Sequence, residues 1–468
     1  MTALNIKTVK PEQAVYTLVV GLGKTGLSVV RYLRTLGEAV IVVDSRDVPP
    51  GLNVLKNEYS DVECHTGKFD TALFVNAHRI VVSPGVALAE PVLVEARNNN
   101  IEIIGDIDLF AHEVMAPVVA ITGSNGKSTV TTLLTLMASE TGKKAVASGN
   151  IGTPVLDSLD DSVDLYVLEL SSFQLETLQY LPKKAAVVLN ISADHLDRYK
   201  DLSAYAMSKQ VIYDNADVLV LNKDDALASG YGASRYGASQ VSDSADKQIR
   251  FTLNQPEENE FGICEDENHK TALCFGRKPL IAVDQLKIKG SHNLQNALAA
   301  LALGHAIGLP FDNMLNALKE FKGLPHRTQF VAEINGVNWI NDSKATNVGA
   351  TVAALVGLPG KHVLIAGGIA KGADFLELAD AVKQHCRAVV LMGKDAAVIK
   401  AVIDDTIPVE SVNDMQAAVL AARSLSQTGD NVLLAPACAS FDMFDNFEHR
   451  GNVFIQSVER LLSEVSLS

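Results

Sequence analysis

The sequence is short of cysteines, of basic residues and of long apolar runs, and each shortage excludes a class of protein. Its five cysteines are scattered and none lies in a C-x-x-C pair, so we expect reduced thiols, no disulfide framework and no zinc cluster. No run approaches the about 20 apolar residues of a membrane helix, and residues 1–13 lack the apolar core of a secretory signal. The 40 Lys and Arg are outnumbered by 55 Asp and Glu, and the net charge of −15 argues against a nucleic-acid partner held on a broad basic face. We therefore expect a cytoplasmic protein that binds neither nucleic acid nor membrane, and we expect a monomer.

Apolar residues make up 47% of the chain, which is enough for sizeable cores, and their pattern predicts an α/β fold. Short apolar runs typical of strands, such as 15–20, 117–122 and 337–341, alternate with amphipathic stretches typical of helices. Alternation of this length is typical of parallel βαβ units. Over 247–288 the pattern changes to short polar-flanked runs that predict a small antiparallel sheet. The predicted domains are 1–105 with a Rossmann-like fold, 106–323 with a P-loop ATPase-like fold that carries the antiparallel sheet, and 324–468 with a second Rossmann-like fold.

The sharpest phosphate-binding signal is a glycine-rich turn between a predicted strand and a predicted helix. It reads Thr122-Gly123-Ser124-Asn125-Gly126-Lys127-Ser128-Thr129. Glycines let backbone N–H groups and the helix N-terminus point at phosphate oxygens. Lys127 would neutralise the charge of the β- and γ-phosphates, and the Ser128 hydroxyl would bind Mg²⁺. Such a turn can be merely structural, but between a strand and a helix it predicts a nucleoside triphosphate site.

A second glycine turn, Gly21-x-Gly23-x-x-Gly26, follows the first predicted strand, and Asp44 ends the next one. This pattern is the dinucleotide-binding fingerprint, in which the carboxylate receives a ribose hydroxyl. Alone it is a weak signal, because similar turns occur where two backbone segments merely pack closely. Ser45-Arg46, directly after Asp44, allows nucleotides other than NAD, so we expect a nucleotide here without assigning NAD.

Polar residues follow several other predicted strands. Glu169 and the pair Asp194-His195 lie at strand ends of the predicted ATP-binding domain, and Mg²⁺ needs oxygen-rich partners besides Ser128. A capped or ion-paired structural role is the alternative for each. Asn293 alone reads as a helix cap, but Asn293 and Asn296 share a helix face that could bind adenine or phosphate.

The third predicted domain places three polar loops at strand ends. They are 341–347, the loop that carries Gly367, Gly368 and Lys371, and 440–450. Ordinary helix caps explain some of these residues but not the gathering of Lys, Thr and Ser in all three loops. The pattern therefore predicts an anionic substrate.

These motifs together resemble the Mur ligases, ATP-dependent amide-bond-forming enzymes of bacterial cell-wall precursor synthesis, over the whole chain and in three domains. The family-wide motifs are the Gly-Lys-Ser turn, Glu169, Asp194-His195 and His292-Asn293-x-x-Asn296. Three further stretches, 83–85, 341–347 and 435–447, resemble the branch that adds D-glutamate to UDP-N-acetylmuramoyl-L-alanine. One departure is Ile369-Ala370, which stands before Lys371 where the family often has an acidic or polar residue.

The resemblance implies an ADP-forming ligation through an acyl phosphate, with roles for residues at matching positions. It implies Lys127, Glu169, His195 and Lys209 as catalytic residues. For the metal it implies Ser128, Glu169, His195 and Lys209, with two Mg²⁺ sites and CO₂ bound as a carbamate on Lys209. For ATP it implies Gly123, Ser124, Asn125, Gly126, Lys127, Ser128, Thr129, Asn293, Asn296, Arg327 and Asp342. For the UDP substrate it implies Lys24, Thr25, Asp44, Ser45, Arg46, Gly85, Asn150 and His195. For D-glutamate it implies Lys344, Thr346, Lys371, Ser440 and Phe447.

Two alternative functions remain at this point. A nicotinamide-dependent oxidoreductase built on the first glycine turn would leave the Gly-Lys-Ser turn and the third domain unexplained. A regulator without catalytic activity would bind nucleotide but would form no amide bond.

Overall fold

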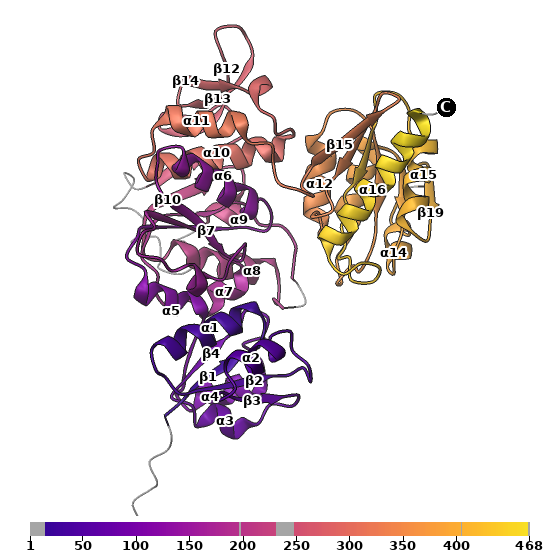
Figure 1. Cartoon of the computed structure of the whole chain (residues 1–468). Coiled ribbons are helices and arrows are strands. Elements are labelled where there is room, and N and C mark those ends of the chain that lie inside the picture. Colours follow the sequence, from indigo (N-terminus) through magenta and orange to yellow (C-terminus); the bar gives the residue numbers. More distant parts are fainter. Residues whose placement is uncertain (1–14, 196–197, 231–247, 404, 467–468) are drawn as a thin grey trace, which may run out of the picture. The chain divides into compact units, whose positions relative to one another are not determined.

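The computed structural model describes residues 15–195, 198–230, 248–403 and 405–466 (Figure 1). The chain forms two compact units. The first comprises Met1–Val118 and Val146–Lys183, and the second comprises Val119–Ala145 and Lys184–Ser468. The predicted α/β class is confirmed, because helices and strands alternate along the described chain and the strands form three sheets.

The N-terminal sheet is the predicted Rossmann-like sheet. Its strands are β1 (Thr17–Val20), β2 (Val40–Asp44), β3 (Glu63–Thr66), β4 (Arg79–Val82) and β5 (Glu102–Ile104), and its helices are α1 (Lys24–Thr35), α2 (Leu52–Glu58), α3 (Thr71–Val75), α4 (Pro91–Asn98) and α5 (Asp106–Glu113). All strand pairs are parallel, in the order β3-β2-β1-β4-β5. Every residue of β1 is buried, as expected for a strand covered on both faces. The strand order reverses beside β1, and in open α/β sheets ligands bind at the carboxyl ends of the strands at such a point.

A nine-stranded sheet has the order β14-β13-β12-β11-β10-β9-β6-β8-β7. Its strands are β6 (Val118–Thr122), β7 (Ala145–Gly149), β8 (Leu165–Glu169), β9 (Lys183–Val188), β10 (Ala216–Asn222), β11 (Gln248–Phe251), β12 (Glu260–Glu265), β13 (Thr271–Phe275) and β14 (Lys278–Ala282). The accompanying helices are α6 (Lys127–Ser139), α7 (Ser172–Thr177), α8 (Leu202–Gln210), α9 (Ala226–Ser229), α10 (Ser291–Ala306) and α11 (Phe311–Glu320). The predicted antiparallel strands are present as β12, β13 and β14. They extend the larger sheet, because β11 pairs in parallel with both β10 and β12.

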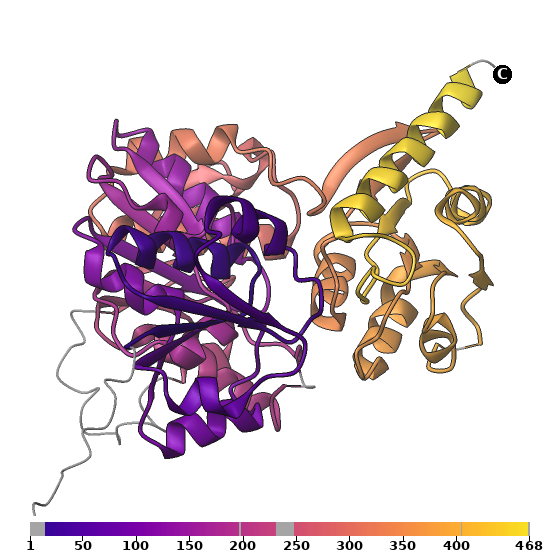
Figure 2. The same ribbon diagram turned by 60° about the horizontal axis from the view of Figure 1, so that its bottom comes forward.

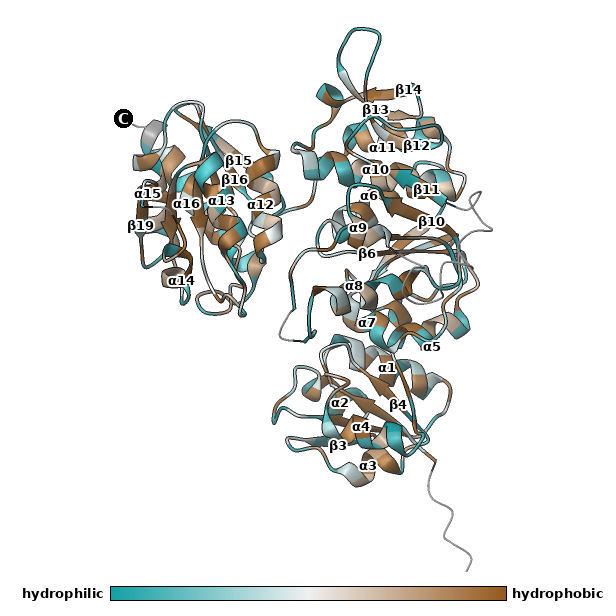
Figure 3. Cartoon of the chain, turned by 180° about the vertical axis from the view of Figure 1, so that it is seen from behind, coloured by the Kyte–Doolittle hydropathy of each residue, from teal (hydrophilic) through white to brown (hydrophobic). Residues whose placement is uncertain are grey.

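The C-terminal sheet has the order β15-β16-β20-β17-β18-β19. Its strands are β15 (Gln329–Ile334), β16 (Val337–Asn341), β17 (His362–Ala366), β18 (Cys386–Leu391), β19 (Val409–Ser411) and β20 (Asn431–Leu434), and its helices are α12 (Val348–Gly357), α13 (Leu376–His385), α14 (Ala396–Lys400), α15 (Met415–Leu425) and α16 (Phe447–Ser466). Only the edge strand β15 runs antiparallel to its neighbour. Two apolar cores cover the two faces of the sheet, and Figure 3 shows its strands as hydrophobic segments behind mixed helices. The yellow helix α16 packs on α15, β15 and β16 (Figure 2).

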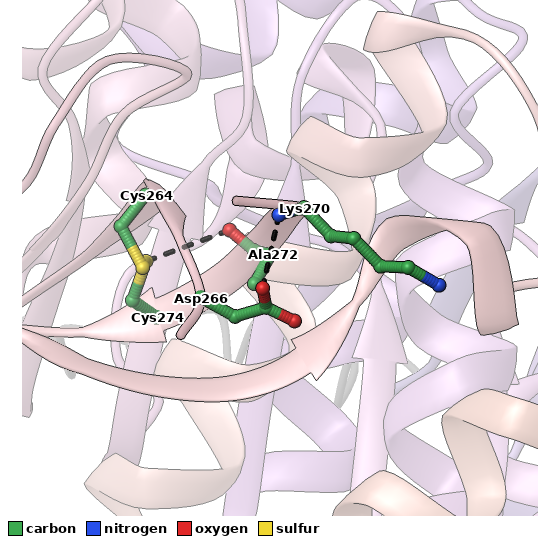
Figure 4. The surroundings of a disulfide bond; sticks show 5 residues. All are labelled: Cys264, Asp266, Lys270, Ala272 and Cys274. Carbon is green, nitrogen blue, oxygen red and sulfur yellow. Dashed lines mark hydrogen bonds between the residues drawn. A yellow bond between two sulfur atoms is a disulfide. The ribbon is translucent and has the colours of Figure 1, made fainter. Parts of the chain in front are cut away.

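The prediction that all cysteines are free thiols is wrong for one pair. Cys264 in β12 and Cys274 in β13 form a disulfide, with their Cα atoms 6.1 Å apart (Figure 4). The antiparallel register pairs Gly262 with Cys274 and Cys264 with Ala272, so the two cysteines lie diagonally across one hairpin. Spacing along the chain does not reveal this proximity, because it depends on the pairing of the two strands. The remaining cysteines, Cys64, Cys386 and Cys438, are free.

Within the residues that the structure places, no helix combines the length and the apolar character needed to cross a membrane.

Candidate active site

The first unit contains a pocket beside the carboxyl ends of β1, β2 and β4, and it gathers the residues predicted for the UDP substrate. The predicted residues that line it are Lys24, Thr25, Asp44, Ser45, Arg46, Gly85 and Asn150. Gly26 of its glycine turn has no room for a side chain, because a Cβ there would lie 1.9 Å from the Gly21 carbonyl oxygen. His195, also predicted for this substrate, belongs to the second unit. Sequence reasoning missed Ser83 and Gln174, which line the same pocket.

Asp44 is fixed at the end of β2 by four hydrogen bonds, one of which the Arg46 backbone N–H donates to Oδ1 at 2.9 Å. The Leu22 N–H donates to Oδ2 at 2.7 Å, and the Arg46 guanidinium donates from Nε to Oδ1 at 2.8 Å and from Nη2 to Oδ2 at 2.6 Å. Burial opposes ionisation of this carboxyl, but the hydrogen bonds from Arg46 and Leu22 outweigh it and lower the pKa of Asp44. The carboxylate is therefore a charged, oriented acceptor in the pocket wall.

Glu169 ends β8 and is 2% exposed. Its Oε1 accepts a hydrogen bond of 2.8 Å from Asn150 Nδ2, whereas its buried Oε2 has no hydrogen-bond partner. A buried carboxylate oxygen without a partner costs free energy. Carboxylate oxygen is also the ligand that Mg²⁺ prefers. The orphaned oxygen of Glu169 therefore fits a metal ligand.

The glycine-rich turn of the second unit joins β6 to α6, as predicted. Gly126 precedes the helix with a φ of 84°, a left-handed conformation that favours glycine. A Cβ at this position would also lie 2.3 Å from Asn296 Oδ1. Lys127 Nζ donates to the carbonyl oxygens of Gly123, at 2.7 Å, and Ser124, at 3.0 Å, so the ammonium lies over the turn.

A second pocket lies beside this turn and brings together most residues predicted for ATP. The predicted residues in its lining are Asn125, Gly126, Thr129, Asn293, Asn296, Arg327 and Asp342. Lys344, predicted for D-glutamate, lines the same pocket. Arg327 reaches the turn directly, because its Nη2 donates to Ser128 Oγ at 2.9 Å. His292, which belongs to a predicted motif but was given no role, and Thr328, which sequence reasoning missed, also line the pocket. Their side chains lie 3.0 Å apart, from Nε2 to Oγ1.

Burial perturbs two ionisable groups of this pocket. It raises the pKa of Asp342 to about 6, against the opposing influence of the Thr328 N–H and the Arg327 charge. Burial also lowers the pKa of His292 to about 4, so this imidazole is neutral at physiological pH. Perturbed groups of this kind gather at functional sites.

His195 lies near three of the predicted lysines. Burial lowers the pKa of His195; Asp194 opposes this shift, whereas the charges of Lys371, Lys209 and Lys127 reinforce it. The backbone N–H of His195 donates to Asp194 Oδ1 at 2.9 Å. These groups therefore form a mostly cationic cluster within the second unit.

Asn347, which was quoted in the polar run but given no role, connects this cluster to the glycine-rich turn. Its Nδ2 lies 3.1 Å from Asp194 Oδ2 and 3.3 Å from Asn125 Oδ1. Its Oδ1 caps α12 by accepting the Ala350 N–H. The contacts to Asp194 and Asn125 depend on folding and are not visible in the sequence.

Lys209 lies in α8 and is 1% exposed. Its Nζ is 3.4 Å from Thr122 Oγ1, at the end of β6, and 4.7 Å from the centre of the Tyr205 ring. The side chain thus reaches the start of the glycine-rich turn from a neighbouring helix.

The residues predicted for D-glutamate lie on three loops of the C-terminal domain and at the start of α16. Lys344 Nζ lies 3.8 Å from the centre of the Phe447 ring, which is a cation–π contact. The loop that carries Lys371 is joined to the loop that carries Ser440, because Ile369 and Ala439 exchange two backbone hydrogen bonds of 2.9 and 3.0 Å. The departure from the family pattern at Ile369 therefore lies in a short β-bridge. Thr346 follows Lys344 in its loop, and its N–H donates to the Lys344 carbonyl at 2.8 Å.

In the described part of the chain, no three His, Cys, Asp or Glu side chains gather as a metal site. In the first unit, the fit to Mg²⁺ rests on the orphaned oxygen of Glu169. In the second unit, the Ser128 hydroxyl is held by Arg327.

Comparison with known proteins identifies the family of the chain. Three family models match successive parts of the chain: "Mur ligase MurD-like, N-terminal domain" over residues 15–105, "Mur ligase middle domain" over 121–304, and "Mur ligase, glutamate ligase domain" over 326–438. The chain belongs to the Mur ligase family.

Curated relatives place it in one branch of that family. It is 50% identical to the UDP-N-acetylmuramoylalanine--D-glutamate ligase of Nitrosococcus oceani, over 97% of this chain and 98% of the relative. It is also 50% identical to the enzyme of that name from Pseudomonas syringae pv. syringae (95% and 98%) and 49% identical to that from Pseudomonas aeruginosa (95% and 98%). The branch that these relatives define is the D-glutamate-adding one.

Solved structures share the fold at low sequence identity. The UDP-N-acetylmuramate-alanine ligase of Thermotoga maritima matches with a TM-score of 0.57 at 18% identity, over 95% of this chain and 99% of that one. A pseudomurein peptide ligase type C from Methanothermus fervidus matches with a TM-score of 0.56 at 20% identity, over 95% and 100%. The three-domain Mur ligase fold is thereby established for this chain.

Proposed function

We propose that the chain joins D-glutamate to UDP-N-acetylmuramoyl-L-alanine with conversion of ATP to ADP and phosphate, as a step of cytoplasmic peptidoglycan precursor synthesis. The substrate carboxylate attacks the γ-phosphorus of ATP, and ADP leaves. The D-glutamate amine then attacks the acyl phosphate, loses a proton and expels phosphate, which leaves an amide bond. Curated relatives that are 49–50% identical over nearly the whole chain carry the name of this activity.

One structural observation carries the proposal. Lys344 lines the pocket that holds the residues predicted for ATP, and the same ammonium lies against Phe447 among the residues predicted for D-glutamate. A group shared by both sets suits a reaction in which the activated carboxyl and the incoming amine must meet. Neither an oxidoreductase nor a regulator without catalytic activity needs a residue shared by a nucleotide site and an amino-acid site.

Bringing a carboxylate to a triphosphate requires cations, because both reactants are anions. Lys127 is the proposed cation for the moving phosphoryl group, and the N-terminus of α6 adds its dipole. Arg327 holds the Ser128 hydroxyl, and its charge acts on the Asp342 carboxyl in the same pocket, so these residues are proposed to orient the nucleotide. Asn293 and Asn296 present amide groups from one face of α10. Catalysis is mainly positioning and charge stabilisation.

Mg²⁺ would supply positive charge to the phosphate oxygens. We assign Ser128, Glu169 and His195 as its protein ligands, and Glu169 is supported by its orphaned oxygen. Lys209 is proposed to carry a carbamate formed with CO₂, which would turn a buried cation into an anionic group on the metal side. Its position beside the end of β6 supports this assignment.

D-Glutamate carries two carboxylates, which need cations and hydroxyl groups. Lys344 and Lys371 supply charge, Thr346 and Ser440 supply hydroxyls, and Phe447 fixes Lys344 by the cation–π contact. The first-unit pocket is proposed to hold the uridine diphosphate group, with Arg46 and Lys24 as cations and the carboxylate of Asp44 as acceptor. We further propose that the protein acts as a monomer.

The test is release of phosphate from ATP in the presence of Mg²⁺, UDP-N-acetylmuramoyl-L-alanine and D-glutamate. We expect release that depends on both substrates together. Reduction of a nicotinamide cofactor would support the oxidoreductase instead, and nucleotide binding without turnover would support the regulator; either result, without phosphate release, rejects the proposal.

A further inference from the structure

Arg450, in the first turn of α16, is a buried cation to which the proposed chemistry assigns no role. It is 2% exposed. Burial lowers the pKa of Arg450 to about 10, against the opposing influence of Cys438 and Asp442, so the guanidinium stays charged at neutral pH. In the part of the chain that the structure describes, no carboxylate forms a salt bridge with it. Its hydrogen-bond acceptors are neutral.

Those acceptors belong to two different loops. Nε donates to Ser343 Oγ at 3.0 Å and Nη2 donates to the Ser343 carbonyl at 2.9 Å, while Nη1 donates to the Cys438 carbonyl at 3.1 Å. Ser343 directly precedes Lys344, and Cys438 lies two residues before Ser440. One planar group thus connects the loop 343–346 to the loop 438–440.

Two further contacts extend this connection to the other residues proposed for D-glutamate. Ser343 Oγ donates to the Phe447 carbonyl at 2.8 Å, which ties the first loop to the residue that stacks on Lys344. The bridge between Ile369 and Ala439 ties the second loop to the loop that carries Lys371. Arg450 therefore contacts two of the three loops directly, and the third loop is joined to one of these two by the bridge.

A buried guanidinium without a carboxylate partner is costly, and an apolar side chain would fill the same space without that desolvation. What only arginine offers is a rigid fork of donors that holds several acceptors at fixed separations. Ser343, 0% exposed, and Cys438, 1% exposed, are packed so that they receive this fork.

We propose that Arg450 is a positioning residue for the amino-acid substrate: it sets the separation of the loops 343–346 and 438–440, and thereby the spacing of the cations and hydroxyls that receive the two carboxylates. The inference rests on the proposed function, because it takes D-glutamate as the ligand of these loops. Arg450 acts through Lys344, Thr346 and Ser440 and itself touches no reactant.

The experiment measures steady-state kinetics of Arg450→Lys and Arg450→Met in the full-length protein, with each substrate varied in turn. We expect the KM for D-glutamate to rise about 10-fold or more in both variants, because a lysine cannot span both loops. The KM values for ATP and for the UDP substrate are expected to change less than about 2-fold. A merely structural role would lower the amount of active enzyme without this selective change.

Arg387→Met is the matched control. Arg387 pairs with Asp430 in the same domain, through hydrogen bonds from Nε and Nη2, and it touches none of the three loops. We expect the control to lower the melting temperature without altering any KM. If it raises the KM for D-glutamate as much as the Arg450 variants do, loss of stability explains the effect and the inference is wrong.

Folded Arg450 variants with an unchanged KM for D-glutamate, or with equal rises for all three substrates, would overturn the inference. If these variants do not fold, Ser343→Ala provides the test. It removes the hydroxyl that accepts from Arg450 Nε and donates to the Phe447 carbonyl, with little change in side-chain volume. A rise in the KM for D-glutamate of about 5-fold is then expected, and an unchanged value contradicts the inference. The proposed function fails separately, if the unmodified protein shows no turnover that depends on D-glutamate.

Discussion

Arg327 Nη2 donates a hydrogen bond of 2.9 Å to Ser128 Oγ, although the two residues lie 199 positions apart. The bond links the start of the C-terminal domain to the glycine-rich turn of the central domain. The guanidinium therefore holds the hydroxyl that is proposed to bind Mg²⁺, and it does so in the wall of the proposed ATP pocket.

Replacement of Arg327 by alanine should weaken nucleotide binding. A hydrogen bond to a charged group contributes about 1.5–3 kcal/mol, so we expect the KM for ATP to rise roughly 10- to 100-fold. The KM for D-glutamate should stay nearly constant. Arg423→Ala, which removes an exposed arginine of α15, is the control and should behave as the unmodified protein. An unchanged KM for ATP in Arg327→Ala would remove the residue from the ATP site.

Glu169→Gln should raise the Mg²⁺ concentration needed for half-maximal activity by about 10-fold or more. The substitution keeps the shape of the side chain and the oxygen that accepts from Asn150, but it removes the charge of the orphaned oxygen. The measurement is phosphate release at a series of Mg²⁺ concentrations. Glu95→Gln, at an exposed position of the same unit, should leave the curve unchanged. Identical metal dependence in the Glu169 variant and in the unmodified protein counts against a ligand role.

The sequence predicted correctly those features that depend on short contiguous stretches of residues. The strand β16 has the predicted bounds, and the glycine-rich turn of residues 122–129 lies between a strand and a helix, as its flanking pattern predicted. The seven first-unit residues predicted for the UDP substrate share one pocket. Six of them end or follow β1, β2 and β4 of the parallel N-terminal sheet, and Asn150 follows β7 of the nine-stranded sheet. The domain boundaries near residues 105 and 323 stay predictions.

What sequence reasoning missed depends on side chains that meet only after folding. His292 and Thr328 come from different segments and pair inside the proposed ATP pocket. The disulfide between Cys264 and Cys274 requires a particular antiparallel register. Arg450 stands in an ordinary helical stretch, and its three acceptors lie on two distant loops. No local pattern encodes such contacts.

The buried carboxyl of Asp342 should make the C-terminal domain less stable as pH rises from about 4 to about 6. Its pKa is raised from 3.8 to about 6 in the folded protein, so the folded state binds its proton more tightly than the unfolded state does. Stability that is present below pH 4 is therefore lost through this window, by about 3 kcal/mol. The Asp342→Asn variant should lose correspondingly less free energy of unfolding over the same pH range.

Urea unfolding at pH 4 and pH 7 checks this difference. The single tryptophan, Trp339, is buried in β16, the strand that ends just before Asp342, so its fluorescence reports the right domain. The exposed control Asp380→Asn should show the same pH dependence as the unmodified protein. Equal losses in Asp342→Asn and in the unmodified protein would show that the carboxyl does not titrate as described.

Lys209→Ala should reduce turnover by about 100-fold or more, since the proposed carbamate would be lost from the metal side. The space that the buried side chain leaves should admit a short carboxylic acid, so formate or acetate should restore part of the activity in a concentration-dependent way. Lys184→Ala, which removes one partner of an exposed ion pair, is the control. Its turnover should equal that of the unmodified protein without any added acid. Turnover of Lys209→Ala near that of the unmodified protein would exclude the residue from the mechanism.

The most direct test of the central claim is the mass of the product. The protein is incubated with ATP, Mg²⁺ and UDP-N-acetylmuramoyl-L-alanine, together with D-glutamate in one reaction and L-glutamate in a matched one. The account predicts a new nucleotide-linked species in the D-glutamate reaction, heavier than the UDP substrate by one glutamate minus one water and formed in equal amount with ADP. Absence of that species, while both substrates and ATP are intact, would contradict the account.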